Sequence, residues 1–152
     1  MPGVIKIKQY DRNAEMQRIN PATNPFVNVF DRNLIQGSGV AVSKSGTIFV
    51  SDAGRHIIWK LNEGTRPVLF AGKTNTPGFV NGTAANARFN TPKDIVADTA
   101  DNLYVFDSGN HRIRKIDANG NISTVTQVNA SIADASLTVS PSGDIYAVAS
   151  GI

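Results

Sequence analysis

Two histidines and two aspartates recur at matching places in the chain and are its first candidates for chemistry. His56 and His111 are its only histidines, and Asp52 and Asp107 each stand two residues before a glycine. Histidine ligates metals and exchanges protons near neutral pH, whereas carboxylates bind calcium or act as acids and bases. Because both pairs recur, we favour a role that every repeat needs, and predict that they bond strands to turns.

Other signatures of catalysis are missing from the sequence. The chain contains no cysteine, which excludes disulfides and thiolate metal sites. It also has no catalytic-triad motif, phosphate-binding loop or zinc-ligand spacing. No stretch approaches the roughly 18 apolar residues of a membrane helix, and residues 1–6 lack the apolar segment of a signal peptide. We expect a protein made in the cytoplasm, without membrane contact, metal or cofactor, and we favour a non-enzymatic protein.

The composition favours short strands joined by tight turns. The 152 residues are enough for one compact domain, and β-branched residues far outnumber the good helix formers. Ten aspartates stand against two glutamates, and 15 asparagines and 13 glycines supply turn positions. The net charge of +3 and pI near 9.4 are explained by a solvated surface, with a patch for anionic partners as the alternative.

An internal repeat organises most of the chain. Residues 39–61 align without a gap to residues 94–116, at an offset of 55. The identities fall at every second position, which is the period of a strand. They include Asp52, Gly54, His56 and Lys60 in the first copy and Asp107, Gly109, His111 and Lys115 in the second. A third, partial copy starts at Ser136 and has Ala149 in place of the aspartate.

These motifs resemble the NHL repeat, a blade unit of β-propellers. Residues 109–116, GNHRIRKI, are similar to the segment from which that repeat takes its name. The resemblance implies an all-β fold of NHL-type blades, with an incomplete ring in this chain and a non-repeat N-terminal segment. Each full blade has four short strands. We expect them at 39–43, 47–52, 56–62 and 66–71, and at 94–98, 102–107, 112–117 and 121–127.

The domain organisation follows from these blades. We expect an N-terminal segment, 1–36, followed by blades over 37–152, with boundaries near 37–72, 92–127 and 134–152. A ring needs roughly four to eight blades, so six at the observed spacing need about 250 to 330 residues. Three explanations stay open: a fragment of a longer protein, a ring closed by several copies, or a cap formed by a partner or by the N-terminal segment. The open C-terminal edge therefore requires a protein partner, further copies or further blades.

The N-terminal segment contains two strand-like pieces, 4–10 and 26–30. Between them, residues 11–19 fit one or two helical turns, ended by Asn20-Pro21. One alternative is that a piece supplies the closing strand of a blade. The other is an extended arm that adds a strand to another subunit. Disorder is the third.

The resemblance implies that inter-blade loops gather on one rim of the propeller. The candidate binding residues on this rim are Arg55, Lys73, Arg88, Lys93 and Asn110. Arg112 and Arg114 are further candidates for a basic face. Aromatic residues for base stacking are sparse, since Trp59 is expected to pack in a strand, so we favour a protein partner over nucleic acid.

The resulting prediction is a propeller module that serves as a protein-binding or assembly surface, including a structural subunit of a large particle such as a virion. The alternatives are an RNA-binding NHL domain and a fragment of a propeller enzyme, a lactonase-like hydrolase or lyase. Lactonase-like propellers bind calcium through side chains that line the channel. Neither Glu15 nor Glu63 falls in a predicted inner strand, which disfavours that alternative.

Overall fold

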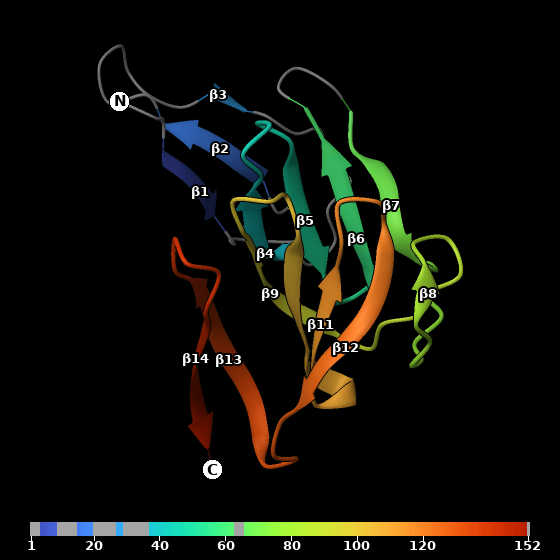
Figure 1. The fold of residues 1–152 in the computed structure, drawn as a ribbon. Coiled ribbons are helices and arrows are strands. Elements are labelled where there is room, and N and C mark those ends of the chain that lie inside the picture. Colours follow the sequence, from blue (N-terminus) through green and yellow to red (C-terminus); the bar gives the residue numbers. More distant parts are fainter. Residues whose placement is uncertain (1–3, 9–14, 20–26, 29–36, 63–65, 152) are drawn as a thin grey trace.

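The computed structural model describes residues 4–8, 15–19, 27–28, 37–62 and 66–151 of the chain. Its elements are strands and one short 3-10 turn within these residues (Figure 1). Strand-rich sheets were expected from the composition, because β-branched side chains pack well on a pleated surface. The all-β prediction is confirmed.

Blade one is a four-stranded antiparallel sheet in the order β4-β5-β6-β7. Its strands are β4 (Gly37–Val42), β5 (Ile48–Asp52), β6 (Ile57–Leu61) and β7 (Val68–Gly72). Each lies within two residues of its predicted position. Ser43 helps to close the first turn, since its hydroxyl accepts the Thr47 N–H at 3.2 Å.

Blade two repeats this sheet and adds a fifth strand. It contains β9 (Pro92–Ala97), β10 (Leu103–Asp107), β11 (Arg112–Ile116) and β12 (Asn121–Gln127), with the 3-10 turn η1 (Ser108–Asn110) after β10. The two-residue strand β8 (Gly82–Thr83) pairs with β12, so the order is β8-β12-β11-β10-β9. Strand β8 was not predicted, because two residues carry no periodic pattern.

Blade three consists of two strands. Strands β13 (Ile132–Val139) and β14 (Ile145–Gly151) form an antiparallel pair. Figure 1 shows them as a separate hairpin, in dark orange and red. The range expected for a partial third blade was 134–152.

The hydrophobic core lies between successive blades. Between blades one and two it is built around Ile58, Phe89, Ile95, Val105 and Ile116, each at most 1% exposed. A second cluster joins blade two to blade three, and its buried members are Tyr104, Phe106, Ile113, Ala135 and Leu137. Blades thus bury their faces against one another, as stacking repeats do.

The first strands of the blades approach closely at their starts. A Cβ atom added to Gly39 on β4 would lie 2.6 Å from the Lys93 carbonyl oxygen of β9. The Ser51 hydroxyl also donates to this carbonyl. Between blades two and three, the Asp94 carboxylate accepts the Leu137 N–H at 2.6 Å. These contacts hold the inner strands β4, β9 and β13 side by side.

The N-terminal segment forms a three-stranded sheet. Its strands are β1 (Val4–Lys8), β2 (Glu15–Ile19) and β3 (Val27–Asn28), in the order β1-β2-β3. The helical turns expected over 11–19 are wrong for 15–19, because all five residues of β2 pair antiparallel with β1. So short a helix is marginal on its own, and strand pairing replaces it. Residues 11–14 lie outside the described part.

Candidate binding surface

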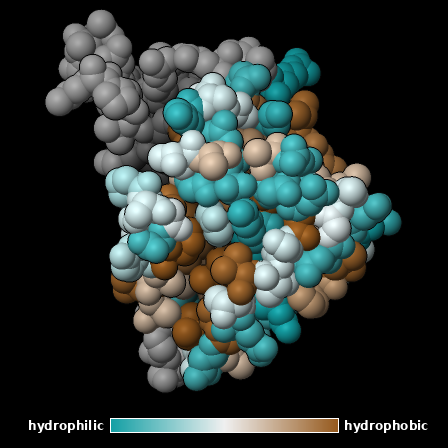
Figure 2. All heavy atoms as spheres, viewed as in Figure 1, coloured by the Kyte–Doolittle hydropathy of each residue, from teal (hydrophilic) through white to brown (hydrophobic). Residues whose placement is uncertain are grey.

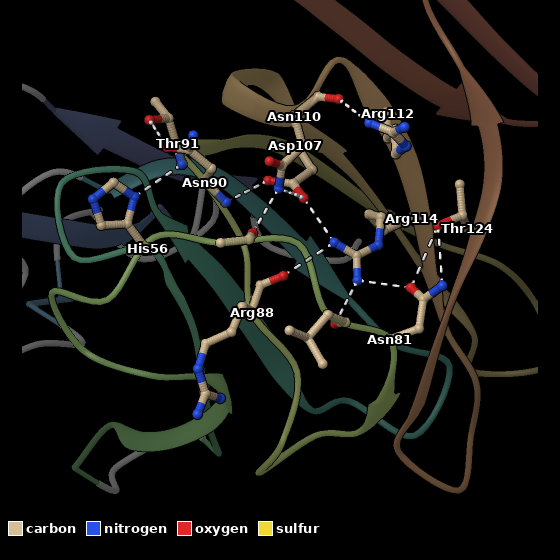
Figure 3. Close-up of polar contacts among 12 residues, drawn as sticks. His56, Asn81, Arg88, Asn90, Thr91, Asp107, Asn110, Arg112, Arg114 and Thr124 are labelled. Carbon is tan, nitrogen blue, oxygen red and sulfur yellow. Dashed lines mark hydrogen bonds and ion pairs between the residues drawn. The ribbon is translucent and has the colours of Figure 1, made fainter.

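Asp107 of blade two is held in a buried ion pair. It ends β10, is fully buried, and accepts a hydrogen bond from the Arg114 guanidinium at 2.8 Å. Its other hydrogen bonds come from the Asn90 N–H and the Asn110 amide, both at 2.7 Å (Figure 3). Burial raises the pKa of the Asp107 carboxyl, and these three donors oppose that rise. Both oxygens of this buried carboxylate therefore accept hydrogen bonds.

Arg114 connects this aspartate to the segment that precedes blade two. Its guanidinium donates to the Arg88 carbonyl at 3.1 Å, and to the Val80 carbonyl and the Asn81 amide oxygen at 2.8 Å each (Figure 3). Burial lowers the pKa of Arg114, while Asp107 opposes this, and an arginine in such a site stays protonated. The expectation that Arg114 contributes to a basic face is wrong, because the side chain is fully buried.

Asp52 holds the same place in blade one with neutral partners. Its carboxylate accepts the Arg55 N–H at 3.0 Å, across the turn, and the Trp59 indole N–H at 3.1 Å. The bond across the turn is the one predicted from the sequence. At Asp107 the backbone donor is instead Asn90, which lies before the blade. Trp59 in blade one and Arg114 in blade two occupy the same position of the repeat. The aspartate therefore accepts from an indole in one blade and from a guanidinium in the other.

The two repeat histidines both lie in left-handed turns, with φ of 63° at His56 and 50° at His111. His56 Nδ1 accepts the Thr91 N–H at 3.0 Å, so this side chain bonds the turn of blade one to the start of blade two. His111 Nδ1 is buried and has no hydrogen-bond partner among the described residues. The two histidines thus share a backbone conformation and differ in contacts.

The remaining repeat residues have structural contacts. A Cβ atom at Gly109 would lie 2.5 Å from the Asn90 side chain, which explains glycine there. Lys60 lies over the Phe70 ring and Lys115 over the Tyr104 ring, with ammonium-to-centroid distances of 5.8 and 5.9 Å. Such contacts orient the lysines on the blade faces.

The five predicted rim residues lie at one end of the blades, where β4, β9 and β13 begin and β5 and β10 end. Lys73 is exposed, and Arg55 is half-buried with its guanidinium 5.8 Å from the Trp59 ring. Arg88 donates to the Ala87 carbonyl at 2.6 Å, and Asn110 donates to the Gly78 carbonyl at 2.7 Å. Arg88 and Asn110 therefore order the loops of this rim in addition to exposing polar atoms.

Lys93 closes one side of a polar cavity at the same end. Its ammonium donates to the Ala133 carbonyl at 2.9 Å and lies 3.7 Å from the Asp134 carboxylate. The cavity has a volume of ≈ 340 Å³. It is lined by residues at the starts of the three inner strands, Ser38, Lys93, Asp94, Asp134, Ala135 and Ser136.

The two ends of the blades differ in charge. The end with the cavity carries five basic side chains that reach its surface, Arg55, Lys73, Arg88, Lys93 and Arg112, against Asp94 and Asp134. The opposite end is formed by the tight turns and carries four aspartates, Asp98, Asp101, Asp117 and Asp144, against Lys44, Arg66, Lys60 and Lys115. Figure 2 shows polar residues over much of the surface, with apolar residues gathered between blades two and three. The cavity end is thus the positive end among the described residues.

The sequence did not point to Phe79 or Asp94. Phe79 is 44% exposed and lies against Arg112, whose guanidinium carbon is 4.3 Å from its ring centroid. Asp94 aligns with Gly39 of the first copy, so the two copies differ in residue type at the position that bonds blade three. Asp94 and Arg114 both differ in residue type from the equivalent positions of blade one. This difference was the sequence signal that could have identified them.

The described residues contain no group of three or more potential metal ligands, and no helix among them is long and apolar enough to cross a membrane. The side chains at the cavity can bind polar or charged groups of a partner. They include one lysine and two aspartates, already bonded to one another or to the backbone.

The fold and these contacts resemble those of NHL-type β-propeller blades. The sequence model of the NHL repeat matches residues 89–116, which contain β9, β10, η1 and β11. The protein SUPPRESSOR OF QUENCHING 1, chloroplastic, of Arabidopsis thaliana is 32% identical over 81 residues. The match covers 53% of this chain and 8% of that protein, so the chain spans less than a tenth of this relative.

Solved structures share the fold. An auxiliary nutrient binding protein from Bacteroides ovatus superposes with a TM-score of 0.72 and 17% identity, over 89% of this chain and 40% of that one. A protein of the same description from Bacteroides thetaiotaomicron gives 0.59 and 19%, over 72% and 30%. The chain therefore spans less than half of each of these two proteins, and the likeness shows the architecture.

Proposed function

We propose that this chain is a non-enzymatic propeller module that binds a protein partner through its positive end. The observation that carries the proposal is the polar cavity of ≈ 340 Å³, which three successive blades line together at the start of their inner strands. Loops and strand starts from different blades converge there, as they do in the binding surfaces of repeat proteins.

The charge of this end specifies the kind of partner. Lys73 and Arg112 have no acidic partner among the described residues, whereas Lys93 is paired with Asp134 and Arg114 with Asp107. Charge complementarity steers association and selects partners, so we expect a protein segment rich in Asp or Glu. Assembly with further copies, or into a particle such as a virion, is a second form of this proposal, since β14 pairs with β13 alone among the described strands.

A selection from a random displayed-peptide library tests the proposal. Selected peptides should be acidic, and their affinity should fall at least several-fold for Lys73→Glu. The matched control is Lys44→Glu, an exposed lysine at the opposite end, which should bind as the unchanged protein does. Peptides without acidic residues, or equal loss in both variants, would contradict it. Binding of single-stranded RNA at ~50 mM salt that weakens steeply with salt would favour the nucleic-acid alternative.

A further inference from the structure

Phe79 is an exposed aromatic residue whose backbone neighbours are both fixed. It is 44% exposed and lies in the connection before blade two. The Gly78 N–H donates to the Phe89 carbonyl at 3.0 Å, and the Val80 N–H donates to the Arg88 carbonyl at 3.4 Å. The ring therefore has a defined place on the surface, and little conformational freedom is lost when another molecule packs on it.

The carbonyl groups on either side of this ring are held by blade two. The Gly78 carbonyl accepts a hydrogen bond from the Asn110 amide at 2.7 Å, and the Val80 carbonyl accepts one from the Arg114 guanidinium at 2.8 Å. Asn110 and Arg114 also donate to the buried Asp107 carboxylate, at 2.7 and 2.8 Å. The buried ion pair and its neighbours thus position an exposed ring in addition to joining the connection to the blade.

Arg112 adds a fixed positive charge to this ring. Its guanidinium carbon lies 4.3 Å from the Phe79 ring centroid, and its Nη1 donates to the Asn110 carbonyl at 2.7 Å (Figure 3). These two contacts orient the guanidinium but use one of its faces and one of its five N–H groups. The other N–H groups of this half-buried side chain have no acidic partner among the described residues, so they are available to a carboxylate.

The charge around the ring is unbalanced. The Arg114 guanidinium carbon also lies close to the Phe79 ring, 4.8 Å from its centroid. Asp107 is the anion of Arg114, with 2.8 Å between the paired nitrogen and oxygen. Burial lowers the pKa of Arg114, Asp107 opposes this, and the charge of Arg112 lowers it further. Two cations thus share one anion among the described residues here, which favours a partner that brings a second anion.

We propose that Phe79 and Arg112 anchor the acidic partner segment, with a carboxylate of the segment on Arg112 and an apolar side chain on Phe79. This assignment rests on the proposed function and specifies its partner further. Aromatic and arginine side chains contribute much of the binding energy in many protein interfaces. Because Phe79 and Arg112 are in contact, the two partner side chains must lie on one face of the segment. In an extended chain such side chains are two residues apart, so the expected motif is Asp or Glu two positions from a large apolar residue.

Truncation of the ring is the first test. The acidic peptide of highest affinity from the displayed library is synthesised with a fluorescent label, and its dissociation constant is measured by anisotropy. Phe79→Ala should weaken binding roughly tenfold or more. The matched control is Tyr146→Ala, which truncates an exposed aromatic residue of blade three and should bind as the unchanged protein does. Urea denaturation checks that each variant is folded.

A pair of charge-conserving changes separates this anchor from general attraction to the positive end. Arg112→Lys keeps the charge but removes the planar guanidinium, which stacks on the ring and can bind a carboxylate through two N–H groups. We expect binding to weaken several-fold. Lys73→Arg is the matched control, and its affinity should equal that of the unchanged protein. If Arg112→Lys also bound equally well, charge alone would explain binding and the inference would be overturned.

Changes in the peptide complete the test. Replacing the acidic residue of the motif by its amide should couple to Arg112→Lys, and replacing the apolar residue by alanine should couple to Phe79→Ala, with weaker coupling in the crossed pairs. Acidic peptides that bind Phe79→Ala as well as the unchanged protein would overturn this inference and leave the proposed function standing. A library that yields no acidic peptide would overturn both. If the two variants weakened binding of oligouridine and not of the peptide, the anchor would take nucleic acid, and the inference would again be wrong.

Discussion

Blades one and two solve the same structural problem with different chemistry. Each buries an aspartate at the end of its second strand, and each satisfies it from the same position of the third strand. Blade one uses the neutral indole of Trp59, and blade two uses the charged guanidinium of Arg114. The indole has one N–H group, which it donates to Asp52. The guanidinium has further N–H groups, which donate to the Val80 and Arg88 carbonyls. The charged solution therefore also fixes the segment that precedes its blade.

The largest effect is expected from removing that charge. Arg114→Ala leaves the fully buried Asp107 without its cation and releases two carbonyls, so the free energy of unfolding should fall by about 3–5 kcal/mol. Urea denaturation of the variant measures it. The control is Arg112→Ala, two residues earlier on the same strand and half-buried, which should cost less than half as much. Equal losses of unfolding free energy in the two variants would mean that the ion pair stabilises the fold no more than the contacts of Arg112 do.

Removing the aspartate of blade one should cost less. Asp52→Ala leaves the Arg55 N–H and the Trp59 indole without acceptors but leaves no buried charge, so a loss of about 1–3 kcal/mol is expected. Asp107→Ala leaves the buried Arg114 guanidinium without its anion and should lower the free energy of unfolding by about 3–5 kcal/mol. Both are measured in the same denaturation series. If Asp52→Ala proved the more destabilising of the two, the distinction between neutral and charged blades would fail.

A smaller change isolates the indole bond. Trp59→Phe keeps an aromatic ring and removes the donor to Asp52, so the free energy of unfolding should fall by about 0.5–1.5 kcal/mol beyond the loss of apolar area. A double-mutant cycle with Asp52→Ala measures the coupling between the two side chains. A coupling near zero would show that packing, and not the hydrogen bond, keeps tryptophan at this position.

The smallest effect concerns the turns that open each blade. Blade one closes its turn with the neutral hydroxyl of Ser43, and blade two uses the carboxylate of Asp98, which accepts the Asn102 N–H at 2.9 Å. Burial would raise the pKa of Asp98, but its hydrogen bonds with Asn102, Ala100 and Tyr104 lower it overall. A lowered pKa in the folded state stabilises the fold above the unfolded value, near 4, and this stabilisation is lost as pH falls through the folded pKa.

Asp98→Asn should therefore remove at most about 1 kcal/mol at pH 7 and should flatten the loss of stability below pH 4. Ser43→Ala is the matched change in blade one and should leave the pH dependence unaltered. Thermal melts between pH 2.5 and 7 measure both. If Asp98→Asn lost stability below pH 4 as steeply as the unchanged protein does, the carboxylate of Asp98 would not distinguish blade two from blade one.

The strands of both blades could be predicted from the sequence because their signals are local. Alternation of apolar residues and turn pairs such as Asn119-Gly120 fix a strand within about two residues. The partners of Arg114 could not be predicted, because the Val80 and Arg88 carbonyls come from a connection without a pattern. The helix expected over 11–19 failed for a related reason. Pairing with β1 is a contact between segments, and the sequence of β2 alone does not show it.

The connection before blade two has a consequence for how the chain opens. Its amides at Gly78, Val80 and Arg88 donate to carbonyls within the same segment, and Arg114 holds two of its carbonyls. A loop bonded in this way should exchange its amide protons with solvent as slowly as the strands beside it. Residues 73–77 are bonded as well, since the Asn75 N–H donates to the Arg55 carbonyl and the Thr76 N–H to the Lys73 carbonyl. A protease should therefore cut this connection only after it has opened.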